Sequence, residues 1–201
     1  MALPHPATFY PELTDDRLRV LAVELLNLRF LTIRSMNSEF DDNYTREGTV
    51  FGRSKNMLVA LALSGEHDWL TLAHAGMDVT VNIGRIPVRY FRDDPNAPGK
   101  PGFFKRNATD CLFEDDEAAP VMWRFVVERA MTDDDEDQVH FVGYNLYQEK
   151  VSLWTYRPSA PMLHSVDSGV PPTMPILPAN VELLEDGEQA EEQERKTGSL
   201  D

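Results

Sequence analysis

The stretch that decides the fold is VMWRFVVERAMTDDDEDQVHFVGYNLYQEKVSLWTYR, residues 121–157. Three runs rich in apolar and β-branched residues follow one another in it: 121–131, 139–146 and 151–156. An acidic turn, 132–138, separates the first two runs, and a short turn at Gln148 and Glu149 precedes the third. Short apolar runs bounded by polar turns are typical of β-strands, and strands this close in sequence pair most simply as an antiparallel meander.

Alternating apolar residues also occur upstream of this stretch and predict three further strands. These strands are expected at 69–74, 79–83 and 86–91. A glycine-containing turn connects the first two, and Gly84 bends the chain before the third. Because proline cannot donate a ladder hydrogen bond, Pro87 predicts that the third strand lies at an edge or carries a bulge. About six strands is a typical sheet size.

The N-terminal region has helical rather than alternating periodicity. Thr14 is a suitable N-cap, Asp15 and Asp16 suit the first turn, and leucines then recur at helical spacing to about residue 33. This helix, 15–33, is apolar enough to be a buried core helix or a homodimer interface. A second helix is expected over 55–64, capped by Ser54 and ended by Gly65, after a loop or partly helical connection at 37–53.

These patterns predict an α+β fold, in which N-terminal helices pack on a mostly antiparallel sheet. We expect one domain over 1–160, an extended proline-rich segment over 161–180, and an acidic, disordered tail over 181–201. The predicted core comprises twelve apolar residues: Leu21, Leu25, Leu28, Leu58, Leu61, Trp69, Val81, Trp123, Phe125, Val127, Phe141 and Leu153.

Composition and charge limit the classes of partner. The chain has 201 residues, a net charge of −15 and one cysteine, so an internal disulfide is excluded. No signal peptide and no sufficiently apolar membrane span is recognisable, which predicts a cytoplasmic protein that does not enter a membrane. Charge is sorted along the chain: residues 43–106 carry +3, whereas 107–160 carry −8 and 161–201 carry −7. The net negative charge of the chain disfavours non-specific binding to DNA or anionic lipid.

The basic central region is one candidate binding surface, for an anion or a nucleic acid. FGRSK, 51–55, places cations at the expected start of the second helix, where anions bind well. Two arginines four residues apart on one strand are expected to share a face. An adjacent aromatic and cationic pair could stack a base or hold a phosphate. The candidate residues are Arg53, Lys55, Arg85, Arg89, Phe103, Phe104, Lys105 and Arg106.

Acidic clusters form a second candidate surface, which would attract a basic partner. They comprise Asp115, Asp116, Asp133, Asp134, Asp135, Glu136 and Asp137. The second cluster does not fit a calcium-binding loop, because Gln138 and Tyr144 stand where that loop needs glycine and glutamate. Ordinary solvated charge at a hairpin tip is the alternative interpretation.

A third, weaker candidate is a metal site formed by His67, His74 and Asp78, since imidazole and carboxylate groups are suitable ligands for transition metals. The ordinary alternative is polar loop chemistry. No GxSxG, SxxK or HRD motif is present, and no cofactor is predicted. The sequence thus leaves enzymatic activity uncertain, although it favours a protein that is not an enzyme.

Two functional hypotheses follow from different classes. The first is a non-enzymatic interaction or regulatory protein whose acidic surface engages a basic protein partner, such as a nucleic-acid-handling machine, as a phosphate-mimicking inhibitor or adaptor. The second is a nucleic-acid-binding or nucleotide-binding component that uses the basic sheet face, in one version a metal-dependent hydrolase.

Overall fold

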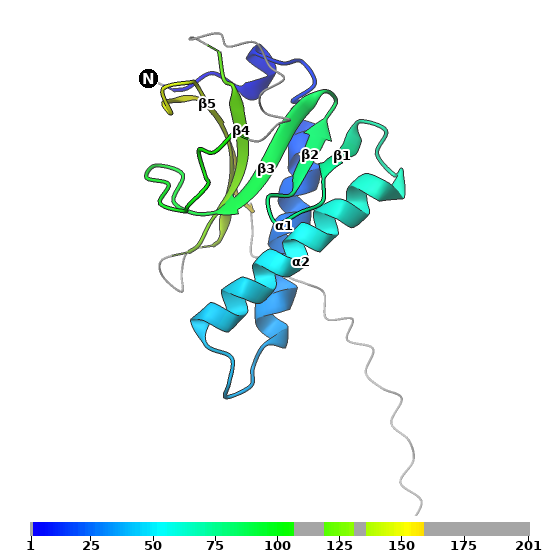
Figure 1. The fold of residues 1–201 in the computed structure, drawn as a ribbon, viewed down its shortest axis with the longest axis vertical. Helices are drawn as coiled ribbons and strands as arrows, with labels where there is room; N and C mark the ends of the chain where they lie inside the picture. Colours follow the sequence, from blue (N-terminus) through cyan, green and yellow to red (C-terminus); the bar gives the residue numbers. More distant parts are fainter. Residues whose placement is uncertain (1, 107–118, 131–135, 159–201) are drawn as a thin grey trace, which may run out of the picture. The chain divides into compact units, whose positions relative to one another are not determined.

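The computed structural model describes residues 2–106, 119–130 and 136–158. They belong to one compact unit, Met1–Met162. After a short 3-10 helix, Pro6–Thr8, the helices are α1, Asp15–Ser35, and α2, Asn43–Ser64. The strands are β1, Leu70–His74; β2, Thr80–Ile83; β3, Ile86–Arg92; β4, Met122–Glu128; β5, Gln138–Tyr144; and β6, Lys150–Tyr156. Figure 1 shows the helices and the sheet, and apolar residues of both helices join one core on a single face of that sheet. The α+β prediction is confirmed.

In the described part of the chain, six strands form one sheet in the order β1-β2-β3-β4-β5-β6. Every neighbouring pair is antiparallel except β3 and β4, which run parallel. The meander expected from residues 121–157 is therefore present as β4-β5-β6. The edge position expected for the third strand is wrong, because β3 lies between β2 and β4. Pro87 is tolerated there because the pairing of β3 with β4 begins only at Val88.

The two faces of the sheet bury different clusters. The face toward the helices carries the main core, where Trp123 stacks on Phe141 with ring centroids 5.1 Å apart. The opposite face carries a smaller cluster in which Phe103, from the segment after β3, packs against Phe91 and Tyr144. Side chains alternate between the faces along each strand, so both faces of β4 are buried.

Most of the predicted core is confirmed. Among its members, eight are buried: Leu21, Leu25, Leu58, Val81, Trp123, Phe125, Val127 and Phe141. The other four are half-buried: Leu28, Leu61, Trp69 and Leu153. The described helices include none that is long and apolar enough to cross a membrane. The predictions for the proline-rich segment and the acidic tail concern residues outside the described ranges.

The expected start of α1 is confirmed, but that of α2 is wrong. Thr14 caps α1 by accepting from the amide of Arg17. The cap of α2 is Asp42 rather than Ser54, and the helix begins at Asn43, twelve residues earlier than predicted. Gly48 and Gly52 suggested a loop, since each costs about 1 kcal/mol in a helix interior. Tertiary packing overrides that cost, because Val50 is buried between them.

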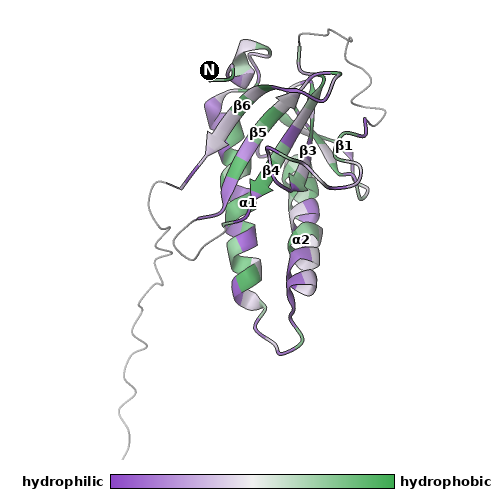
Figure 2. Cartoon of the chain, turned by 90° about the vertical axis from the view of Figure 1, so that its left-hand side faces the viewer, coloured by the Kyte–Doolittle hydropathy of each residue, from purple (hydrophilic) through white to green (hydrophobic). Residues whose placement is uncertain are grey.

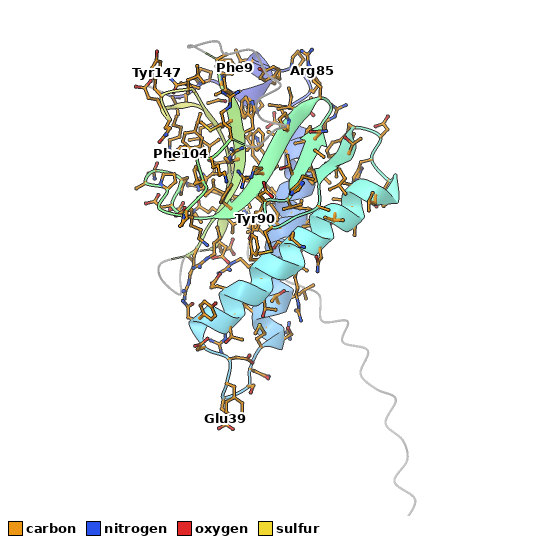
Figure 3. The ribbon with its side chains drawn as sticks, in the orientation of Figure 1. Phe9, Glu39, Arg85, Tyr90, Phe104 and Tyr147 are labelled. Atoms are coloured by element: carbon orange, nitrogen blue, oxygen red, sulfur yellow. The ribbon has the colours of Figure 1, made fainter. Side chains whose placement is uncertain are left out.

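The helices form a hairpin that extends past the sheet. Figure 2 shows α1 and α2 side by side, continuing beyond the strands to their connecting loop. We call residues 30–46 the projecting end: the end of α1, the loop and the first turn of α2. Figure 3 places Glu39 at its tip, while Arg85 lies at the opposite end of the sheet. Ser38 and Asp41 order the loop, because the Ser38 amide donates to the Asp41 carboxylate at 2.8 Å.

Candidate functional site

A buried charge network fastens the hairpin to the sheet where the projecting end begins. Arg29 of α1 donates through two nitrogens to both carboxylate oxygens of Glu47 in α2, at 3.0 and 3.2 Å. Its Nε donates to Asp137, just before β5, at 2.6 Å. Glu47 also forms an ion pair with Arg92 at the end of β3, at 2.9 Å. Four segments distant in sequence therefore meet at one point.

The electrostatics of this network keep it ionised. Burial alone would lower the pKa of Arg29, but the hydrogen bonds and charges of Glu47 and Asp137 outweigh it and raise the pKa above its ordinary value. Arg29 is only 5% exposed, so removal of its partners would leave a charge without solvation. Because the partners fork around a planar guanidinium, lysine would not replace it.

Beyond this network, the projecting end exposes apolar and aromatic side chains. Phe40 is 80% exposed and Tyr44 is 87% exposed, on either side of the N-cap of α2. Leu31, in the last turns of α1, is 54% exposed. Two carboxylates close to these rings in sequence, Glu39 and Asp42, are also exposed. Exposed aromatic groups beside charge are typical of protein-binding surfaces rather than of a self-contained fold.

Asp42 contributes a permanent negative charge to this surface. Its carboxylate accepts from the backbone amide of Thr45 at 2.7 Å and from the Thr45 hydroxyl at 2.8 Å. These hydrogen bonds, the backbone one foremost, lower the pKa of Asp42 below its ordinary value. The same contact that begins the helix therefore keeps the carboxylate ionised.

A cleft of about 590 Å³ lies beside the charge network, between the helices and the adjoining ends of β4 and β5. Arg34 of α1, Arg46 of α2 and Arg129, next to the end of β4, line it together with Phe30 and Ile33. Its volume is in the range of small-molecule sites. The cleft thus combines several guanidinium groups with an apolar wall.

The candidate basic surface is not gathered in one place. Arg85 lies in the exposed turn after β2 and pairs with Glu12 at 3.4 Å, whereas Arg89 is buried. Arg89 donates to the backbone carbonyls of Gly102 and Lys105, which fastens the segment after β3 onto the sheet. Four-residue spacing did not place the two arginines on one surface, because Arg85 precedes the strand.

The remaining basic and aromatic candidates have mostly structural surroundings. Phe103 is 1% exposed and Phe104 is half-buried against Tyr144, while Lys105 is exposed and Arg106 half-buried. Arg53 donates to the hydroxyls of Thr32 and Ser35. Arg53 and Lys55 lie in the interior of α2, so the anion-binding helix start expected at 51–55 is wrong: amides there are used inside the helix.

Of the acidic candidates, the structure describes Glu136 and Asp137. Glu136 is exposed, whereas Asp137 is engaged with Arg29 and also accepts from the amide of Ala130. The remaining acidic candidates lie outside the described residues: Asp115, Asp116, Asp133, Asp134 and Asp135.

The histidine candidates separate into two sets of contacts. His74 pairs with Asp78 at 2.8 Å across the turn between β1 and β2, as the hairpin prediction implied. His67 instead stacks on Trp69, with ring centroids 5.0 Å apart. In the described part of the chain, no group of three or more histidine, cysteine or acidic side chains is arranged to hold a metal ion.

Sequence reasoning did not identify the residues of the charge network and the cleft. One signal was available: Arg29 falls four residues after Leu25 on the apolar face of α1, so a buried cation needing an acidic partner could be expected. Nothing local marks Arg46 and Arg129 as neighbours, because one lies in α2 and the other just after β4, far apart in the chain. Comparison with protein-family models, curated proteins and solved structures gives no match.

Proposed function

We propose that this protein is a non-enzymatic interaction protein that engages a basic protein partner through the projecting end of its helical hairpin. The observation that carries the proposal is the exposure of two aromatic rings, Phe40 and Tyr44, at a part of the fold that extends past its own core. Aromatic groups are enriched among the residues that dominate binding energy at protein interfaces. Rings as exposed as these are available to a partner.

Charge indicates the chemistry of that partner. In the sequence, Glu39 precedes Phe40, Asp41 and Asp42 lie between the two aromatic residues, and the whole chain carries −15. A basic surface would be attracted to this end and would approach faster than a neutral one. A protein that normally binds phosphate groups has such a surface, so an adaptor or inhibitor of a nucleic-acid-handling machine is the form of the proposal that we favour.

The alternative, nucleic-acid binding by a basic sheet face, has less support. Its two arginines, Arg85 in the turn after β2 and Arg89 in β3, differ in exposure, and the ring of Phe103 is buried against Phe91 and Tyr144. A base-stacking surface needs exposed rings beside cations. The described face offers that combination only at Phe104 and Lys105.

The proposal is tested with the full-length protein as bait in an extract of its native host. The wild type is compared with the double variant Phe40→Ala, Tyr44→Ala and with the control Leu63→Ala, which removes an apolar side chain that is 69% exposed at the other end of α2. Proteins recovered by the wild type are identified, purified and titrated against all three baits at low and high salt. Thermal unfolding of each bait verifies that it is folded.

Support requires a basic protein that binds the wild type and the control equally. The double variant should bind it at least tenfold more weakly, and added salt should weaken wild-type binding. Equal binding by the double variant would place the interface elsewhere and overturn the proposal. Recovery of an acidic partner would overturn the charge argument.

A further inference from the structure

Among the described residues, the cleft beside the charge network is lined by more cationic than acidic side chains. Arg29 is matched by Glu47 and Asp137. In contrast, no carboxylate in the described residues lies within ion-pair distance, 4.0 Å, of Arg34, Arg46 or Arg129. Among the lining residues, cations therefore outnumber acids, although the chain as a whole is strongly acidic.

The guanidinium groups of the cleft also retain unused hydrogen-bonding capacity. The Nε of Arg46 is buried and has no acceptor among the residues that the structure describes. Arg129 donates to the side-chain oxygen of Asn43 at 3.2 Å, which uses one of its five N–H groups. A buried donor without an acceptor is costly, and like charges held together repel, so an anion in the cleft would relieve both penalties.

The shape and lining of the cleft indicate the class of anion. Guanidinium groups bind phosphate oxygens with two parallel hydrogen bonds, a geometry that ammonium groups cannot reproduce. Phe30 and Ile33 add an apolar wall against which a ring could lie. A volume of about 590 Å³ accommodates a molecule larger than a single inorganic ion.

We propose that this cleft binds a small phosphorylated organic anion of the size of a nucleoside diphosphate. Arg34, Arg46 and Arg129 hold the phosphate groups, and Phe30 and Ile33 contact the organic part. The net charge of the chain repels such ligands at long range, so binding depends on these arginines rather than on the general field.

This inference goes beyond the proposed function and does not depend on it. The cleft and the exposed rings Phe40 and Tyr44 are formed by different side chains. A bound anion would link α1, α2 and the segment after β4 at the base of the projecting end. The variants that test partner binding and those that test anion binding change different residues. Either proposal can therefore be overturned while the other is supported.

The test is isothermal titration calorimetry of the full-length protein with two probes, ADP and inorganic pyrophosphate, at one fixed ionic strength. The variants are Arg46→Gln and Arg129→Gln, and the control is Arg85→Gln, which removes an equal charge at the far end of the sheet. Arg46→Lys keeps the charge but loses the two-pronged geometry. Thermal unfolding without ligand confirms that each variant is folded.

We expect ADP to bind more tightly than pyrophosphate, since only ADP can use the apolar wall. Each glutamine variant should lose about tenfold or more in ADP affinity, Arg46→Lys an intermediate amount, and Arg85→Gln almost none. Undetectable binding of both probes at millimolar concentration would overturn the proposal. Equal losses in the control would overturn it too, because they would reveal binding to net charge alone. Equal affinity for the two probes would overturn the assignment of an organic ligand.

Discussion

The two ends of the helical hairpin are stabilised in different ways. Where α1 and α2 cover the sheet, Leu21, Leu25 and Leu58 are buried in a continuous apolar core. At the projecting end, the tie to the sheet is the ionic contact of Arg29, after which large apolar side chains become exposed. The end that covers the sheet is stabilised by burial of apolar side chains. The projecting end depends on paired charges and leaves side chains exposed to other molecules.

The largest effect is expected from a core truncation at the sheet end. Leu21→Ala removes a side chain with 0% exposure and should lower the free energy of unfolding by about 2–5 kcal/mol. Leu31→Ala, on the same helix but at the projecting end, should change it by about 0.5 kcal/mol or less. Chemical denaturation of both variants measures the contrast. Similar losses at the two positions would mean that the projecting end is packed in solution.

A somewhat smaller loss is expected when the ionic tie is broken. Arg29→Ala leaves Asp137 without its cation and should cost about 3 kcal/mol, the low end for broken buried pairs because Asp137 is partly exposed. Arg34→Ala removes an exposed arginine one and a half turns later and should have little effect on unfolding. If the two variants unfold alike, the network does not fasten the hairpin to the sheet.

The glycines of α2 provide a test in the opposite direction. Gly48→Ala adds a methyl group where nothing lies within 4 Å, so it should stabilise the protein by about 0.5–1 kcal/mol. Gly143→Ala, in β5, is the contrasting variant, because its Cβ would lie 2.8 Å from the Trp123 ring and from Pro120. It should destabilise. A loss of stability in Gly48→Ala, seen in thermal unfolding, would contradict a continuous helix there.

The smallest effect is expected from a change in pH. It acts through His140, whose side chain lies on the sheet face away from the helices. Burial, partly offset by Glu128, lowers the pKa of His140 below its ordinary value. The unfolded chain therefore takes up a proton at a higher pH than the folded one. Stability should fall as pH decreases from about 7 through the ordinary histidine range. His140→Gln should flatten this slope, whereas Arg29→Ala should retain it; an unchanged slope in His140→Gln would contradict the assignment.

Local sequence was sufficient for the elements but not for the candidate site. The apolar, β-branched runs in residues 121–157 indicate three strands, and Thr14 with the acids after it marks the start of α1 within one residue. The start of α2 was misplaced because Gly48 and Gly52 disfavour a helix locally, while their neighbours' tertiary contacts stabilise it. Helix propensity is a weak guide wherever packing decides.

The acidic run before β5 shows why the site itself could not be predicted. In sequence, Asp137 is one of five consecutive acids at a turn, and such a run is usually solvated. In the fold it meets Arg29, 108 residues away in the chain, because packing places α1 against β5. No spacing rule connects positions on elements that meet only through packing.

The sequence by itself determined the α+β class, the capped first helix, the strand meander and most of the core, because side-chain periodicity and capping act over a few residues. Tertiary structure decided the parallel contact of β3 with β4, the partners of Arg29, the burial of Arg89 and Phe103, and the grouping of Arg34, Arg46 and Arg129. These features depend on which elements become neighbours, a result of packing all the apolar faces at once.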